Sequence, residues 1–182
     1  LRGRFPGLTV VDADDAFWTA LAKESAAFEP ATAASDLAVF QYTSGTTREL
    51  PEAVKHTHRS VVTLMVAALY GVGLEPGDRY FCPSSPAWGH GLWHGTIAPL
   101  ALGIHIAAYS GKFDPLRVLE ALQDFEIDNF SAAPTVIRMI RNSDAVGRFR
   151  IRLKKLSYTG EPMDLATWDW AKEAFGLSPC SM

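Results

Sequence analysis

The chain reads Leu37-Ala38-Val39-Phe40-Gln41-Tyr42-Thr43-Ser44-Gly45-Thr46-Thr47, so an apolar run passes directly into a cluster of glycine and hydroxyl residues. The apolar run predicts a strand, and the cluster predicts a loop at its carboxyl end. Glycine allows a ligand close to the backbone, whose N–H groups can donate to a polyphosphate together with the hydroxyls. The loop is therefore a candidate phosphate-binding site, made of Thr43, Ser44, Gly45, Thr46 and Thr47.

The composition of this loop leaves two interpretations open. Clusters of this kind are often solvated turns, and no Gly-Lys-Ser/Thr follows that would make the loop a P-loop. His56, His58 and Arg59 come shortly afterwards and favour anion binding, because a basic side chain can offset phosphate charge.

Strand, turn and helix alternate along the rest of the chain. The expected strands are 37–41, 79–82, 104–109, 129–132 and 156–159. The expected helices are 12–28, 59–70, 92–102, 115–125, 134–141 and 165–175. This alternation predicts an α/β fold with a mostly parallel sheet under helical cover. Residues 1–35 are expected to form an N-terminal helix and linker, and residues 36–182 the main domain.

Composition bounds the class of protein. Hydrophobic residues make up 48% and charged residues 20% of the 182 residues, which is typical of a globular protein. The net charge of −3 gives no reason to expect a nucleic-acid partner. No segment approaches the roughly 20 apolar residues that a membrane span needs. Cys82 and Cys180 lie far apart, which favours a reduced, cytoplasmic setting, and the alternating run 148–155 predicts an exposed basic edge.

Two further loops follow predicted strands. The first contains Trp88-Gly89-His90, whose aromatic, glycine and histidine residues suit the wall of a small-molecule pocket, or else a packed helix start. The second contains Gly160-Glu161-Pro162, a tight loop able to contact a base or ribose, or else an ordinary turn before a helix capped by Asp164. In open α/β sheets ligands bind at the carboxyl ends of strands, where the three loops 43–53, 83–91 and 159–164 all fall.

The histidines raise the alternative of a metal site. His56 and His58 alternate, while His90 and His94 are spaced to share one face of a helix. No cysteine accompanies them, and Glu52 is the nearby carboxylate, so the sequence favours packed or capping histidines over a metal centre.

Taken in order, the three loops resemble the adenylate-forming (AMP-binding) superfamily. Residues 42–47, with Pro51 and 54–58, look like its phosphate-loop signature. Trp88-Gly89-His90 is similar to the acyl-pocket segment of the acetyl-CoA synthetase branch, and Gly160-Glu161-Pro162 to the motif lining the adenine and ribose side. The resemblance covers residues 36–182. It implies a partial N-terminal domain of an acyl-CoA synthetase.

The loop also departs from the family pattern, which runs Thr-Ser-Gly-Thr-Thr-Gly, one residue, then Pro-Lys-Gly. Arg48 stands at the last glycine of the first part, and Glu52 and Ala53 replace Lys-Gly after one extra residue. A glutamate beside polyphosphate is repulsive, although Arg48 could supply the lost cation. A subfamily with its own loop is the favoured interpretation.

The resemblance implies an activity and its small molecules. The parent enzyme would activate a carboxylic acid with ATP to acyl-AMP and then form a thioester with coenzyme A, with Mg²⁺ as the metal. The family's Tyr-Gly-x-Thr-Glu segment, ribose-binding Asp and catalytic Lys are not found in these 182 residues. The isolated chain is therefore expected to be an inactive fragment. The alternative is a non-catalytic nucleotide-binding fragment.

Overall fold

The computed structural model describes residues 4, 7, 9–42 and 53–182. The chain divides into two compact units, Leu1–Ala33 and Ala34–Met182. The first unit contains α1 (Asp15–Leu21), which begins where the Asp14 side chain accepts a hydrogen bond from Phe17 N. The helix is shorter than the predicted 12–28, because the Ser25 hydroxyl bonds to the backbone of Ala27 and so favours a turn over helix.

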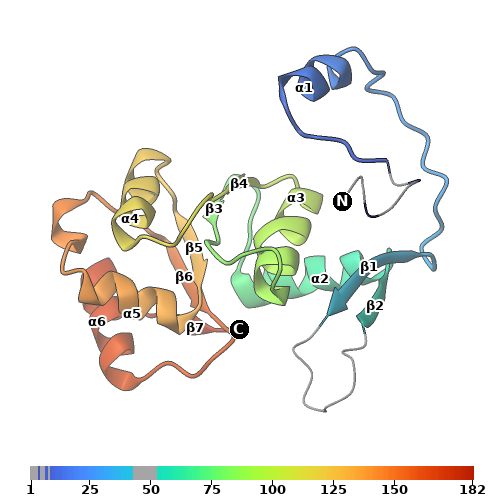
Figure 1. The fold of residues 1–182 in the computed structure, drawn as a ribbon. Helices are drawn as coiled ribbons and strands as arrows, with labels where there is room; N and C mark the ends of the chain where they lie inside the picture. Colours follow the sequence, from blue (N-terminus) through green and yellow to red (C-terminus); the bar gives the residue numbers. More distant parts are fainter. Residues whose placement is uncertain (1–3, 5–6, 8, 43–52) are drawn as a thin grey trace. The chain divides into compact units, whose positions relative to one another are not determined.

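The second unit is built on a five-stranded parallel sheet (Figure 1). Its strands, in spatial order, are β4 (His105–Ala107), β3 (Arg79–Phe81), β5 (Asn129–Ala132), β6 (Lys155–Tyr158) and β7 (Cys180–Ser181). Every neighbouring pair is parallel, which confirms the predicted α/β fold. The two-residue strand β7 had no sequence signal, because it is too short to show a period.

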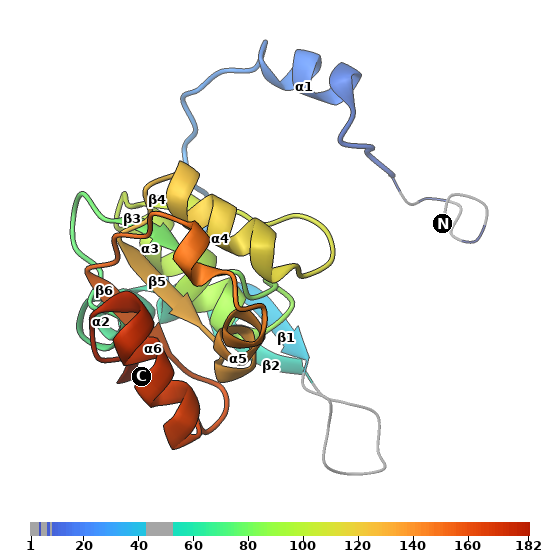
Figure 2. The same ribbon diagram turned by 90° about the vertical axis from the view of Figure 1, so that its left-hand side faces the viewer.

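Helices cover both faces of this sheet (Figures 1 and 2). On one face α4 (Pro115–Asp124), α5 (Pro134–Asn142) and α6 (Leu165–Phe175) pack on a core that includes Phe81, Phe130 and Leu156. On the other face lie α2 (Ser60–Ala67), the π-helical η1 (Ala68–Val72) and α3 (Ala98–Ala101), packed around Tyr80 and Cys82. Successive residues of β3 thus serve opposite faces, as the period of a strand requires. The unit also contains the π-helical η2 (His90–Ile97) and the 3₁₀ turn η3 (Val146–Arg148).

The predicted strand 37–41 is present but does not join the parallel sheet. It forms β1 (Leu37–Tyr42), which pairs antiparallel with β2 (Ala53–Thr57) in a separate two-stranded sheet. The sequence predicted a loop over residues 43–53 and no strand before the helix 59–70, so β2 was missed. Lys55 and His56 obscure the strand pattern, but β2 is stabilised by its register with β1.

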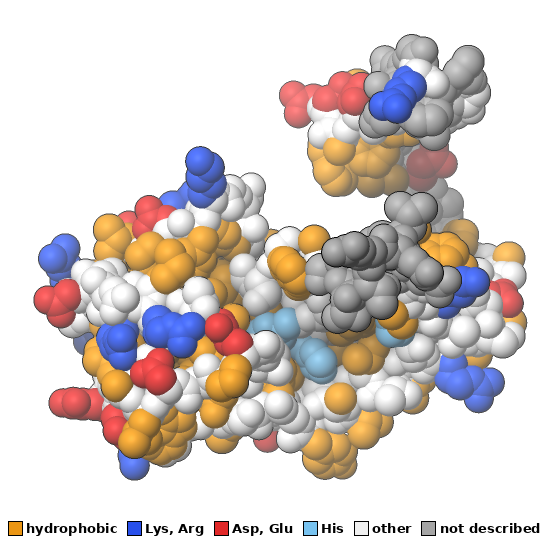
Figure 3. Space-filling model, turned by 60° about the horizontal axis from the view of Figure 1, so that its bottom comes forward, with side chains coloured by type: hydrophobic (Ala, Val, Ile, Leu, Met, Phe, Trp, Pro, Cys, Tyr) orange, Lys and Arg blue, Asp and Glu red, His pale blue; other side chains and the backbone are white. Residues whose placement is uncertain are grey.

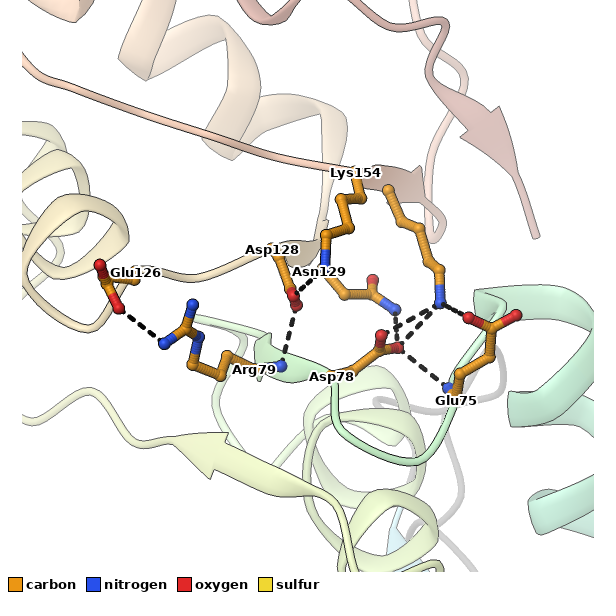
Figure 4. Close-up of polar contacts among 8 residues, drawn as sticks. Glu75, Asp78, Arg79, Glu126, Asp128, Asn129 and Lys154 are labelled. Atoms are coloured by element: carbon orange, nitrogen blue, oxygen red, sulfur yellow. Dashed lines mark hydrogen bonds and ion pairs between the residues drawn. The ribbon is translucent and has the colours of Figure 1, made fainter.

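Acidic and basic side chains meet at the amino-terminal edge of the parallel sheet (Figure 4). The buried Asp78 lies between Glu75, whose N–H donates to it, and Asn129, whose side-chain amide does the same, each at 2.9 Å. Lys155 Nζ lies 3.0 Å from Asp78 Oδ2. In the neighbouring strand connection, Asp128 accepts from Lys154 Nζ at 2.9 Å. These pairs tie β3, β5 and β6 together at the end opposite the polar loops.

The basic run before β6 behaves as the alternation predicts. Phe149, Ile151 and Leu153 pack against the core, while Arg150 and Arg152 are exposed. The predicted cap of α6 is also confirmed: Asp164 accepts a hydrogen bond from the first turn of that helix, and Asp114 does the same at α4. No helix among the described residues has the length and apolar character to cross a membrane.

Candidate functional site

A cavity of about 610 Å³ opens at the carboxyl edge of the sheet. The loops after β3, β4, β5 and β6 supply its walls. The lining residues are Pro83, Ser84, Ser85, Trp88, Gly89, His90, Tyr109, Gly111, Phe113, Ala133, Val136, Thr159, Gly160 and Glu161. Among these described residues Glu161 is the one carboxylate, and none is a Lys or Arg. Histidine side chains also lie beside apolar ones on the face seen in Figure 3. The cavity is large enough for a small organic ligand.

Trp88 and His90, the predicted acyl-pocket residues, both line this cavity. Trp88 is 69% exposed, so its ring is available to a ligand. His90 begins η2, and both its ring nitrogens have serine partners: Nδ1 lies 3.1 Å from Ser84 Oγ, and Nε2 lies 3.1 Å from Ser131 Oγ. Burial, with the nearby His94, lowers the pKa of His90 from 6.5 to about 4. His90 is therefore neutral at physiological pH.

The start of η2 is pressed against the loop that follows β3. A Cβ added to Gly91 would collide with the backbone carbonyl oxygens of Ser84 and Ser85. Glycine is thus the residue that allows η2 to approach this loop so closely. The Thr96 hydroxyl donates to Gly91 O at 2.9 Å, which supports the wide π-helical turn. This close packing brings His90 and Ser84 together.

Gly160 and Glu161, from the predicted adenosine-side loop, line the same cavity. Gly160 has φ of +95°, a conformation that other residues adopt only with strain. The Glu161 carboxylate accepts from Thr135 N at 2.8 Å and from Arg138 Nη2 at 3.1 Å. Hydrogen bonds from Thr135, followed by the charge of Arg138, lower the pKa of Glu161. Pro162 is exposed and is not among the lining residues.

The hydrogen bonds of the Glu161 side chain connect two segments of the site. They join the loop after β6 to the amino end of α5, which itself follows β5. Arg138 also approaches Asp164, the cap of α6, at 3.4 Å. Arg138 therefore holds two carboxylates of one loop. The arrangement fixes the position of Gly160 at the cavity wall.

The predicted phosphate-binding residues Thr43, Ser44, Gly45, Thr46 and Thr47 lie outside the described residues. The strands that flank them are placed, with Tyr42 opposite Ala53 in the β1–β2 register. Gln41 Oε1 accepts from Trp93 Nε1 at 2.9 Å, and the rings of His56 and Trp93 meet with centroids 4.6 Å apart. The hairpin is thus held against η2, the element that carries His90.

Sequence reasoning missed several residues of this site. Ser84 and Ser131 contact His90, Thr135 and Arg138 hold Glu161, and Tyr109 lines the cavity. The rule that placed the other loops could have found two of these positions. Thr135 and Tyr109 follow β5 and β4 at the carboxyl edge, where parallel strands present ligand-binding loops.

The alternative of a histidine metal centre has no support in the described part of the chain. No group of three or more His, Cys, Asp or Glu side chains there could hold an ion. His90 and His94 have ring centroids 6.3 Å apart, and burial lowers the pKa of His94 as well. Mg²⁺ commonly keeps several waters and binds through one or two carboxylates together with substrate phosphates. Glu161, already bonded twice, is poorly suited to hold that ion.

Known proteins similar to this chain include acyl-CoA and acetyl-CoA ligases. The family model described as AMP-binding enzyme matches residues 5–181. The chain is 29% identical over 173 residues to 4-hydroxybutyrate–CoA ligase 1 of Metallosphaera sedula, covering 93% of this chain and 30% of that protein. It is 30% identical over 179 residues to acetyl-coenzyme A synthetase of Coprinopsis cinerea, covering 92% and 27%.

A solved structure agrees with both relatives. The crystal structure of Brucella canis acyl-CoA synthetase superposes with a TM-score of 0.78 at 25% identity, covering 96% of this chain and 32% of that one. The chain thus spans about 30% of the length of the first of these relatives. The family match, in contrast, extends over almost all of the 182 residues. The chain belongs to the AMP-binding enzyme family.

Proposed function

We propose that the chain supplies the acyl and nucleotide walls of an AMP-forming acid–thiol ligase. The whole protein activates a carboxylic acid with ATP to give acyl-AMP and pyrophosphate. A thiol, coenzyme A in this proposal, then displaces AMP to give a thioester. The observation that carries the proposal is that Trp88, His90, Gly160 and Glu161, from two motifs about 70 residues apart, line one cavity.

Each wall has a distinct task in this proposal. Trp88 and His90 line the acyl and adenylate region, and Gly160, with Pro162 beside it, contacts the adenosine. Thr43, Ser44, Gly45, Thr46 and Thr47 bind the phosphates. Glu161 acts mainly by positioning its loop, because both its carboxylate oxygens already accept hydrogen bonds. Catalysis would then depend on orientation and on stabilising charge at the phosphoryl group, with no protein nucleophile.

Mg²⁺ would enter this site bound to the phosphates of ATP. When bound, it neutralises charge on the phosphate oxygens. The chain's own residues hold and orient the acid and the adenosine, and the neutral His90 adds no charge to the wall. The acid is a short one in this proposal, since the bulky Trp88 ring lines the cavity and relatives are named for acetate and 4-hydroxybutyrate.

An ATP–pyrophosphate exchange assay on the whole protein tests the proposal. Exchange that depends on acetate, butyrate or 4-hydroxybutyrate is the expected result. If the protein binds nucleotide but shows no exchange with any of the three acids, the proposal is refuted and the non-catalytic alternative is favoured. Glu52, which is repulsive to polyphosphate, is the sequence feature that suggests this alternative. The 182-residue chain alone is expected to bind AMP without turnover, because it spans about 30% of a related ligase.

A further inference from the structure

A series of hydrogen-bonded side chains, three serines and one histidine, leads from the core of the sheet to the wall of the cavity. Ser157 in β6 donates from Oγ to Ser131 Oγ in β5 at 2.8 Å, and both side chains are buried. Ser131 Oγ lies 3.1 Å from His90 Nε2, and His90 Nδ1 lies 3.1 Å from Ser84 Oγ. Four polar groups thus connect in series, and the last one lines the cavity.

The series has one consistent direction when Ser157 is taken as the first donor. Ser131 Oγ then accepts from Ser157, and its own proton is available for His90 Nε2. A neutral imidazole that accepts at Nε2 carries its proton on Nδ1 and donates there. That donor meets Ser84 Oγ. The lowered pKa of His90, about 4, is consistent with a ring that stays neutral.

Ser84 is the end of this series. Its oxygen accepts from His90, so its own proton is left to donate elsewhere. Cys82 Sγ lies 3.7 Å from His90 Nε2 and 4.0 Å from Nδ1, but burial raises the pKa of its thiol, and a neutral sulfur accepts hydrogen bonds weakly. Ser84 lines the cavity, and among the cavity's described lining residues no Lys or Arg competes with it as a donor to an anion.

We propose that the Ser84 hydroxyl donates to an oxyanion of the bound ligand, either a carboxylate or a phosphate oxygen, and that His90 and Ser131 position it. His90 is then a positioning residue, because its two nitrogens are both occupied by serines. The identity of the ligand rests on the proposed function. The order of the hydrogen bonds does not depend on it.

The tautomer of His90 tests the series directly. In ¹⁵N-histidine-labelled chain, nuclear magnetic resonance is expected to show His90 neutral at about pH 7 with its proton on Nδ1. Ser131→Ala should allow the ring to exchange between both tautomers. A proton on Nε2 in the unaltered chain would overturn the proposal, since Ser84 would then have to donate to His90.

Ligand binding tests the role of Ser84, with Ser85 as the matched control. Both serines line the cavity, but Ser85 Oγ accepts from Ala87 N and takes no part in the series. Calorimetric titrations would use AMP and butyrate separately, which distinguishes a phosphate from a carboxylate partner. Ser84→Ala should weaken binding of one of them roughly tenfold or more, as expected for a hydrogen bond to a charged group. Ser85→Ala should change either affinity less than about twofold.

Equal effects of the two alanine substitutions would overturn the role of Ser84. Ser84→Thr keeps the hydroxyl and should restore most of the affinity, which separates loss of the donor from loss of packing. If the unaltered chain binds neither AMP nor butyrate, the proposed function fails instead. The tautomer of His90 then still decides whether the hydroxyl series is correct.

Discussion

Replacing Asp78 by alanine tests how the amino-terminal edge of the sheet is held together. Asp78 is 7% exposed, and its carboxylate accepts hydrogen bonds from three separate segments: from Glu75 N, the Asn129 side chain and Lys155 Nζ. Asn129 is fully buried, and its Oδ1 has no partner among the described residues. Loss of Asp78 would therefore leave the whole Asn129 amide without hydrogen bonds.

The expected cost follows from these contacts. Removing one partner of a buried ion pair costs about 3–5 kcal/mol, and stranding a buried donor costs about 1–3 kcal/mol. Lys155 is 25% exposed and keeps Glu75 as a partner at 2.9 Å, which reduces the first figure. We expect Asp78→Ala to lower the free energy of unfolding by about 2–4 kcal/mol. Asp78→Asn keeps an acceptor and should cost less, about 1–2 kcal/mol.

The same cluster supplies a matched control. Arg79 and Glu126 form an ion pair at 2.7 Å, shorter than the Asp78–Lys155 contact, but their side chains are 48% and 70% exposed. Because exposed pairs contribute little, Glu126→Ala should cost less than about 1 kcal/mol. Urea unfolding followed by tryptophan fluorescence measures both variants. If Glu126→Ala costs as much as Asp78→Ala, burial does not determine the strength of these contacts and the reasoning fails.

Three further predictions concern the cavity. The free energy of unfolding should fall as pH drops from about 6.5 towards 4, because His90 takes up its proton at a higher pH in the unfolded chain than in the folded one. Partial exposure of His90 limits this loss to about 1–2 kcal/mol. Urea unfolding measured over a pH series should show a smaller dependence of stability on pH for His90→Gln than for the unaltered chain. Gly91→Ala should lower the free energy of unfolding by about 1–3 kcal/mol, because the added Cβ collides with backbone carbonyls. Gly147→Ala, whose Cβ would meet no atom within 4 Å, should change the free energy of unfolding by less than about 0.5 kcal/mol. Glu161→Ala should weaken AMP binding roughly threefold or more by releasing Thr135, and an unchanged affinity would contradict its positioning role.

Much of the parallel sheet could be predicted from the sequence because its central strands β3, β5 and β6 are largely buried. All four residues of β5, Asn129–Ala132, are buried, and the predicted strand 129–132 has the same bounds. The helix α6, Leu165–Phe175, was likewise predictable from its cap and its period. Local signals of this kind need no knowledge of distant contacts.

The β1–β2 hairpin could not be predicted in the same way. Its strands are largely exposed, so the alternation of apolar and polar residues is weak, and β2 depends on its partner strand for its hydrogen bonds. The roles of Glu161 and Ser131 also depend on distant partners. Thr135 lies 26 residues before Glu161, and Ser131 lies 41 residues after His90. Spacings of this length carry no periodic signal.

These distant contacts change how the site should be understood. A motif in the sequence suggests that each of its residues contacts the ligand. The polar side-chain atoms of Glu161 and His90, however, form hydrogen bonds with other residues of the protein. Their bonds instead fix the residues beside them, Gly160 and Ser84, at the cavity wall. Groups held this way lose little freedom when a ligand binds, so the interactions they make are stronger. Substitution of Glu161 or His90 should therefore act on affinity through its neighbour, and the conservative variants that keep the neighbour in place should retain binding.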